Sequence, residues 1–136
     1  MALARRFEDL QVWQEASALT VEVYRVARQP RALADRAFCD QMCRAAVSIM
    51  NNIAEGFERD GRREFAQFLR IAKGSAGEVR SLLHLALSLG YLTAMQHTAL
   101  TASAETLSRR ISRFIASLQK PRRTAPPAGR GADPVT

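Results

Sequence analysis

The sequence is poor in the residues that build disulfide frameworks, metal centres and membrane spans. It has two cysteines, two histidines and one tryptophan among 136 residues. No window approaches the roughly 20 continuous apolar residues that a membrane helix requires. The first ten residues, MALARRFEDL, contain no apolar stretch typical of a secretion signal. We therefore expect a soluble, cytoplasmic protein with no membrane partner.

The few cysteines and histidines follow no pattern of metal or redox chemistry. Cys39 and Cys43 lie four residues apart in one expected helix, which favours neighbouring core thiols over a disulfide. His84 and His97 fall on different segments without a Glu-x-x-His pair, so the ligands of a bundle-type di-iron site are missing. The sequence predicts no metal site and no cofactor.

Lysine is also scarce, although the chain is strongly basic. The formal net charge of +7 rests on 18 arginines and only two lysines, Lys73 and Lys120. The guanidinium group is a planar fork of donors that suits phosphate and carboxylate, although a biased genome composition would give the same preference. The composition thus permits nucleic-acid binding without proving it.

No stretch alternates apolar and polar residues between turns, so no strand is predicted. Four segments instead carry apolar residues at steps of three and four, which is typical of amphipathic helices. The first runs from about Glu8 to before Pro30, the second from an Asp35 cap to the Asp60-Gly61 turn, the third from there to Gly90, and the fourth through Leu100 to Leu118. The seam of the second is Cys39, Met42, Ala46, Ile49, Ile53 and Gly56, that of the third begins at Phe65, and that of the fourth ends with Phe114 and Leu118. With short connections, this pattern predicts an all-α, antiparallel up-down-up-down four-helix bundle.

The end of the chain differs from the rest in composition. Residues 119–136, QKPRRTAPPAGRGADPVT, hold four of the five prolines and show no apolar periodicity. Such a segment cannot contribute much to a core. We expect residues 1–118 to form one bundle domain and residues 119–136 to form a disordered basic tail.

The second helix is more polar than a core helix requires. Its stretch SIMNNIAEGFERDG, residues 48–61, belongs to a continuous stripe beside the apolar seam. The stripe consists of Gln41, Arg44, Ser48, Asn52, Glu55 and Arg59. If the second and third helices fold back about Gly61, Arg44 lies near Glu78, and we predict an ion pair between them.

The third helix has a matching patch of small residues, Gly74 to Gly77. Each glycine costs roughly 1 kcal/mol relative to alanine in a helix interior. This cost predicts a close helix approach, or a kink, at these positions.

Two interpretations of the polar stripe remain. The first is a polar packing interface without chemistry, and the second is a ligand or catalytic site built from Asn52, Glu55 and Glu78. The first is favoured because the sequence supplies no nucleophile with a base, no phosphate-cradling glycine loop and no metal cluster. We therefore predict that the protein is not an enzyme.

Arginines concentrate at one pole of the expected bundle and along one helix. The pole joins the start of the first helix, the turn between the second and third, and the end of the fourth. The nucleic-acid-binding candidates at this pole are Arg59, Arg62, Arg63, Arg110, Arg113, Lys120, Arg122 and Arg123. Arg70 and Lys73 recur with Arg63 and Arg80 along one outward side of the third helix. This side is either a track for a phosphate backbone or an ordinary solvated helix face.

Three stretches resemble the four-helix-bundle family of 23S ribosomal RNA intervening-sequence proteins. They are FEDLQVWQEA at 7–16, QMCRAAVSIMNNIAEGFER at 41–59 and EFAQFLRIAKGSAGEVRSLLHLALSLGYL at 64–92. The resemblance implies a protomer that assembles into a ring-like homopentamer without known enzymatic activity. A related branch, the accessory variability determinant of diversity-generating retroelements, is a basic pentamer that binds a reverse transcriptase and nucleic acid.

On this resemblance, the polar residues Arg44, Asn52, Glu55, Arg59 and Glu78 are expected to hold the bundle and its assembly together. The leading hypothesis is a non-enzymatic oligomer that associates with structured RNA or DNA through arginine-phosphate contacts. The alternative is an oligomeric scaffold for a protein partner such as a reverse transcriptase, with any nucleic-acid contact secondary.

Overall fold

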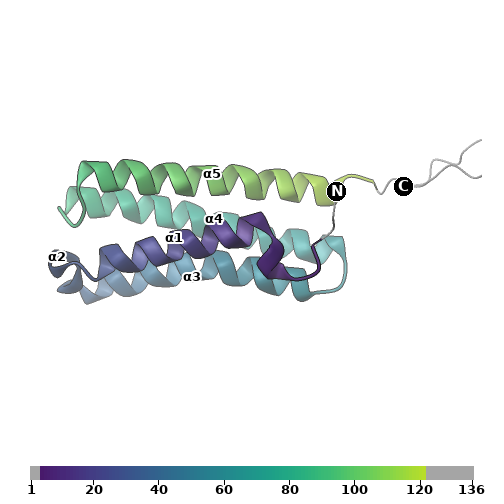
Figure 1. Ribbon diagram of the computed structural model, residues 1–136, viewed down its shortest axis with the longest axis horizontal. Coiled ribbons are helices and arrows are strands. Elements are labelled where there is room, and N and C mark those ends of the chain that lie inside the picture. Colours follow the sequence, from purple (N-terminus) through teal and green to yellow (C-terminus); the bar gives the residue numbers. More distant parts are fainter. Residues whose placement is uncertain (1–3, 122–136) are drawn as a thin grey trace, which may run out of the picture.

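A computed structural model describes residues 4–121, and its regular structure is entirely helical over that range. The elements are the 3-10 helix η1 (Phe7–Asp9) and the α-helices α1 (Gln11–Ala27), α2 (Pro30–Leu33), α3 (Arg36–Glu58), α4 (Arg62–Ser88) and α5 (Ala94–Gln119). The four long helices lie alongside one another in an elongated bundle (Figure 1). The all-α class and the helical bundle are confirmed.

The predicted apolar seams form the core of this bundle. Each long helix places residues without any exposed surface in it, among them Val23, Met42, Ile53, Leu83 and Ile111. The predicted seam residues Cys39, Phe65, Phe114 and Leu118 are only partly buried and pack against its edge. No helix within the described residues is long and apolar enough to cross a bilayer.

Contacts between neighbouring helices fix their register. Arg62, at the start of α4, donates a 2.8 Å hydrogen bond to the carbonyl oxygen of Ser117 near the end of α5. Thr20 of α1 donates to the carbonyl oxygen of Ala46 in α3 at 3.1 Å. α3 packs on α4, α1 packs on α3, and α5 packs on α4. α1 and α5 also contact each other, which closes the bundle.

The ends of the helices follow the predicted cap and turn residues. The Asp35 side chain accepts a hydrogen bond from the backbone N–H of Phe38 at 3.1 Å and caps α3. Gly61 and Gly90 have positive φ angles of 91° and 73°, a conformation that glycine adopts at little cost. Gly61 thus lies at the start of α4, and Gly90 follows the end of the same helix.

The first helix differs from the prediction. We expected one helix from about Glu8, but η1 is followed by an extended Leu10 (φ −75°, ψ 128°), and α1 begins only at Gln11. The break has a packing reason, since Leu10 packs against the core and Phe7 meets Trp13 edge to face at 5.3 Å. The short helix α2, which begins with Pro30, was also not predicted.

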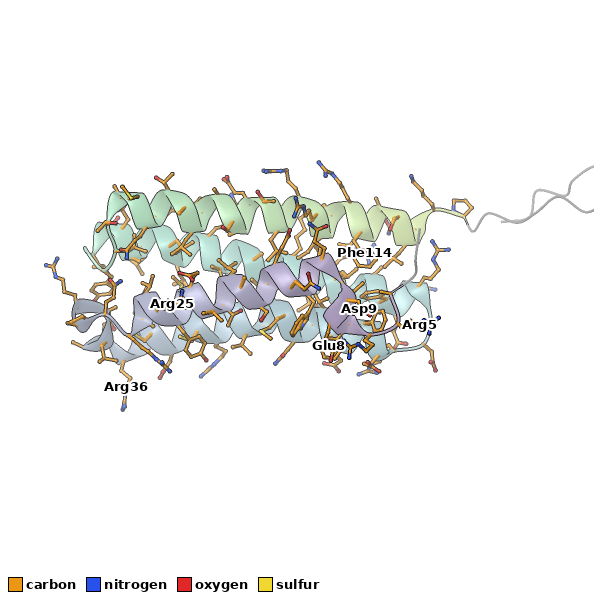
Figure 2. The ribbon with its side chains drawn as sticks, in the orientation of Figure 1. Arg5, Glu8, Asp9, Arg25, Arg36 and Phe114 are labelled. Carbon is orange, nitrogen blue, oxygen red and sulfur yellow. The ribbon has the colours of Figure 1, made fainter. Side chains whose placement is uncertain are left out.

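The two ends of the bundle carry different side chains. Figure 2 shows Arg5, Glu8, Asp9 and Phe114 toward one end of the bundle and Arg36 at the other. The predicted tail, with Arg122 and Arg123, lies outside the described residues apart from its first three positions.

Candidate nucleic-acid interface

Part of the polar stripe on α3 is a hydrogen-bonded contact with α4. The hydroxyl oxygens of Ser48 and Ser75 are 2.8 Å apart, and Ser75 is buried. Asn52 donates from Nδ2 to the carbonyl oxygen of Ser48 at 2.8 Å and to its Oγ at 3.0 Å. These bonds give polar groups partners between two packed helices, as the packing interpretation of the stripe requires.

The predicted Arg44–Glu78 ion pair is wrong, although the predicted register is right. Both residues line one depression of about 510 Å³ between α3 and α4, together with Asp40 and Ser48. They do not form an ion pair with each other in the structure of residues 4–121. Both side chains are exposed, so solvent can reach each charge and neither requires the other as a partner.

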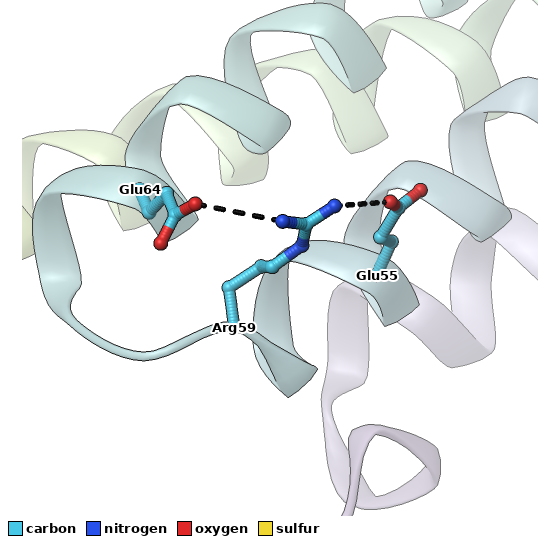
Figure 3. A network of polar contacts seen from close by, with 3 residues as sticks. All are labelled: Glu55, Arg59 and Glu64. Carbon is cyan, nitrogen blue, oxygen red and sulfur yellow. Dashed lines mark hydrogen bonds and ion pairs between the residues drawn. The ribbon is translucent and has the colours of Figure 1, made fainter.

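Arg59 joins the end of α3 to the start of α4 (Figure 3). Its Nη2 donates to Glu55 Oε2 at 2.8 Å, and its Nη1 lies 3.6 Å from Glu64 Oε2. The guanidinium also lies over the ring of Phe68, 5.0 Å from its centroid. The hydrogen bond to Glu55 raises the pKa of Arg59. These contacts fit a structural role for Glu55 and Arg59, because a phosphate would compete with two carboxylates for this cation.

The close helix approach occurs at Gly56 and not at the glycines of α4. A Cβ on Gly56 would lie 2.6 Å from Phe68 Cβ and 2.9 Å from Phe65 Cδ1, whereas a Cβ on Gly74 or Gly77 would meet nothing within 4 Å. The prediction that the α4 glycines mark a tight contact is therefore wrong within this chain. Gly56 lies in the apolar seam of α3, and a glycine in that seam was the sequence signal that could have located the close approach.

Gly74 and Gly77 instead line an open groove between α4 and α5. The groove has a volume of about 560 Å³. Its lining residues are Arg70, Lys73, Gly74, Gly77 and Arg80 from α4, and Ser108, Ser112, Ile115 and Gln119 from α5. We call it the basic groove, since three cations and no acidic side chain line it.

The cations of the basic groove differ in their partners. Arg80 Nη2 lies 3.7 Å from Glu105 Oε2. Arg70 and Lys73 are exposed, and neither forms an ion pair among the described residues. The groove therefore presents two cations that no acidic side chain in this part of the chain neutralises.

Several arginines of the predicted basic pole are engaged in contacts. Arg62 bonds the Ser117 carbonyl, and Arg110 forms an ion pair with Glu15 of α1. Arg110 and Arg113 also line a shallow pocket of about 400 Å³ between α1 and α5. Arg63, Arg113 and Lys120 are exposed. The pole thus offers fewer free cations than the count of its arginines indicated.

No set of three or more His, Cys, Asp and Glu side chains within residues 4–121 is arranged to hold a metal ion. Cys39 and Cys43 are free thiols, and burial raises the pKa of both. A raised pKa leaves less of the reactive thiolate at neutral pH.

One pair of side chains was missed by the sequence analysis. His97 Nε2 lies 3.1 Å from His84 Nδ1, which joins α5 to α4 beside their connecting turn. The sequence analysis placed the two histidines on separate segments. In the sequence analysis, the second and third helices fold back about Gly61. Folding the third and fourth back about Gly90-Tyr91 in the same way would have placed His84 opposite His97.

Comparisons with known proteins address the fold and the family. Residues 8–113 match the family model described as 23S rRNA-intervening sequence protein. A crystal structure of a protein of unknown function from the S23 ribosomal protein family of Bacteroides thetaiotaomicron is similar, with a TM-score of 0.70 and 20% sequence identity. The alignment covers 77% of this chain and 95% of that one. No curated protein matches the chain.

Proposed function

Because the chain belongs to the 23S rRNA-intervening sequence protein family, we propose that it is a non-enzymatic oligomer that binds the phosphate backbone of structured RNA or DNA. The observation that carries the proposal is the basic groove between α4 and α5. It combines cations, hydroxyls and two glycines at which an added Cβ would meet nothing within 4 Å.

The lining of the groove suits a phosphodiester backbone. Arg70, Lys73 and Arg80 provide positive charge along one wall, and the hydroxyls of Ser108 and Ser112 provide donors along the other. Arginine, lysine and serine side chains are common partners of phosphate oxygens. Such contacts position a nucleic acid without reading its bases, so we expect binding with little sequence preference.

The glycines explain how a backbone could approach closely. A side chain at Gly74 or Gly77 would fill space that no atom of the chain occupies within 4 Å. The helix gives up roughly 1 kcal/mol for each glycine relative to alanine. An occupant from outside the protomer, lying against the α4 backbone, would explain both the open space beside the glycines and the stability that they cost the helix.

Assembly would strengthen weak contacts. We propose that the protomer has an up-down-up-down topology and assembles into a ring-like homopentamer, as the family resemblance implies. Five copies would repeat the groove around the ring, and linked weak sites bind a long partner with higher avidity than one site alone. Lys120, together with Arg122 and Arg123, which lie outside the described residues, would add positive charge to each copy.

The test is a binding titration with a charge-matched control. Full-length protein freed of nucleic acid is titrated with a labelled RNA hairpin and a labelled DNA duplex. We expect Arg70→Gln/Lys73→Gln to weaken binding to both. Arg28→Gln/Arg36→Gln removes the same charge from exposed residues of another part of the surface, and we expect it to retain most of the affinity.

Equal weakening by the two double variants would show that net charge matters and the groove does not. Absence of binding by the wild type near physiological salt would reject the proposal and favour the scaffold with a protein partner. Far-ultraviolet circular dichroism and light scattering would show that each variant keeps its helices and its oligomeric state.

A further inference from the structure

The histidine pair lies at the end of α4 and α5 away from the Arg62–Ser117 contact. His84 is near the end of α4, and His97 is in the first turn of α5. Their facing nitrogens are 3.1 Å apart, and their ring centroids are 4.9 Å apart. We propose that this pair binds a divalent late first-row transition metal ion of the class Zn²⁺, Ni²⁺ and Cu²⁺.

The spacing of the two nitrogens fits two bonds to one ion. Zinc-to-imidazole bonds are about 2.0–2.1 Å long, and with nitrogens 3.1 Å apart they enclose an angle of about 100°. That angle lies between the right angle of octahedral coordination and the tetrahedral angle. His84 is exposed and His97 is half-buried, so small side-chain rotations can aim both lone pairs at one position.

Binding requires a change of tautomer and no redox partner. In the neutral pair, one of the two facing nitrogens carries a hydrogen and donates it to the other. On metal binding, that hydrogen moves by way of water to the outer nitrogen of the same ring. Both facing nitrogens, His84 Nδ1 and His97 Nε2, then offer a lone pair to the ion, and each ring remains neutral.

The turn between α4 and α5 holds the two helices at this spacing. Thr93 and Gln96 form a capping box at the start of α5, with bonds of 3.1 Å and 2.8 Å. Tyr91 donates to Asp35 Oδ2 at 2.7 Å, and Arg31 donates to the Gly90 carbonyl oxygen at 3.2 Å. These bonds fasten the turn to α2 and to the N-cap of α3, so the histidine backbones are positioned before an ion arrives.

The two donors select the class of metal. Imidazole nitrogen suits Zn²⁺, Ni²⁺ and Cu²⁺, whereas Mg²⁺ and Ca²⁺ prefer oxygen ligands. No third His, Cys, Asp or Glu completes the group within residues 4–121. The site therefore leaves coordination positions to water or to a group from another molecule, and we expect exchangeable binding rather than a closed structural centre.

The experiment uses the full-length chain with any affinity tag removed, because a polyhistidine tag would bind the same ions. Zinc chloride is added while the histidine ring signals are followed by NMR, and thermal unfolding is measured in parallel. We expect saturable changes confined to the rings of His84 and His97 and a rise in Tm. Magnesium chloride should produce neither effect.

Two sets of variants separate this site from the thiols. His84→Gln and His97→Gln should each lose the Tm rise. His84 is exposed, His97 is half-buried, and neither belongs to the apolar core. Cys39→Ser/Cys43→Ser should retain it. Unchanged ring signals in the wild type, or a zinc response that survives in the histidine variants, would overturn the proposal.

Discussion

At the scale of single residues, three helical glycines differ in their surroundings and therefore in their expected effect on stability. Gly56 lies against Phe65 and Phe68, where a Cβ would come within 2.6 Å of Phe68 Cβ. Gly74 and Gly77 lie in the same kind of structure, a helix interior, but a Cβ there would meet only open space. The first glycine is needed for packing, and the other two weaken their helix.

This contrast gives a prediction with a built-in control. We expect Gly56→Ala to lower the free energy of unfolding by about 1–3 kcal/mol, because the added methyl overpacks the α3–α4 contact. Gly77→Ala should raise it by about 1 kcal/mol, because alanine favours the helix and meets nothing. Urea denaturation at one protein concentration measures both. A loss of stability in Gly77→Ala would show that another protomer already occupies this surface.

A second prediction concerns the hydrogen bond from Tyr91 to Asp35. This bond lowers the pKa of Asp35 and raises the pKa of Tyr91. The lowered value stabilises the fold above about pH 4, the unfolded pKa of aspartate, and this stabilisation is lost as the pH falls through the folded value. The raised value stabilises the fold below about pH 10, and this part is lost as the pH rises through the folded value of tyrosine.

Tyr91→Phe should therefore be less stable than the wild type at neutral pH, and the difference should shrink in both acid and alkali. Urea denaturation at acid, neutral and alkaline pH would show this directly. Tyr91→Phe keeps the ring that meets Phe38, so a variant as stable as the wild type at neutral pH would show that Tyr91 contributes through its ring and not through its hydroxyl.

At the scale of the elements, α3 and α4 are joined by a polar contact beside their apolar seams. Ser48 and Ser75 share a hydrogen bond of 2.8 Å, and Asn52 donates to Ser48 from the next turn. Such a contact fixes which residues of the two helices face each other, because a slipped register would leave the Ser75 hydroxyl buried without a partner. The contact thus contributes specificity as well as stability.

A double-mutant cycle tests this coupling. We expect Ser48→Ala and Ser75→Ala to interact by about 0.5–1.5 kcal/mol in the free energy of unfolding, since each removes the partner of the other. Ser48→Ala combined with Ser108→Ala, which lies on α5, should be additive. Additive effects for both pairs would show that the hydroxyl contact does not couple the helices.

The elements themselves could largely be predicted from the sequence, because apolar spacing records which face of each helix is buried. Met42, Ile49 and Ile53 were assigned to the core on spacing alone, and each is fully buried. The break at Leu10 could not be predicted, because it depends on tertiary packing against the core rather than on local preference. Asp35 and Gly90 were predictable, since cap and turn chemistry is local.

The candidate site was less predictable, because it depends on which side chains of different helices meet. The sequence placed Arg70 and Lys73 on one outward side, and both line the basic groove. It could not indicate that Ser108 and Ser112 complete the groove, or that Glu55 and Glu64 engage Arg59. A charge count along a sequence does not show which cations are already paired.

At the scale of the whole molecule, the central claim is that this basic bundle binds nucleic acid through the groove between α4 and α5. The formal charge of +7 per chain gives attraction to any polyanion, but only specific phosphate contacts depend on particular side chains. Those contacts release counterions, and so they determine how steeply affinity falls with salt.

The most direct measurement is the slope of log affinity against log salt for a DNA duplex, for the wild type and for Arg70→Gln/Lys73→Gln. We predict a steep slope for the wild type, and a slope in the variant that is smaller by roughly 0.9 for each phosphate that the two side chains neutralise. An unchanged slope in a folded variant of unaltered mass would contradict the account, because the groove would then make no contact with phosphate.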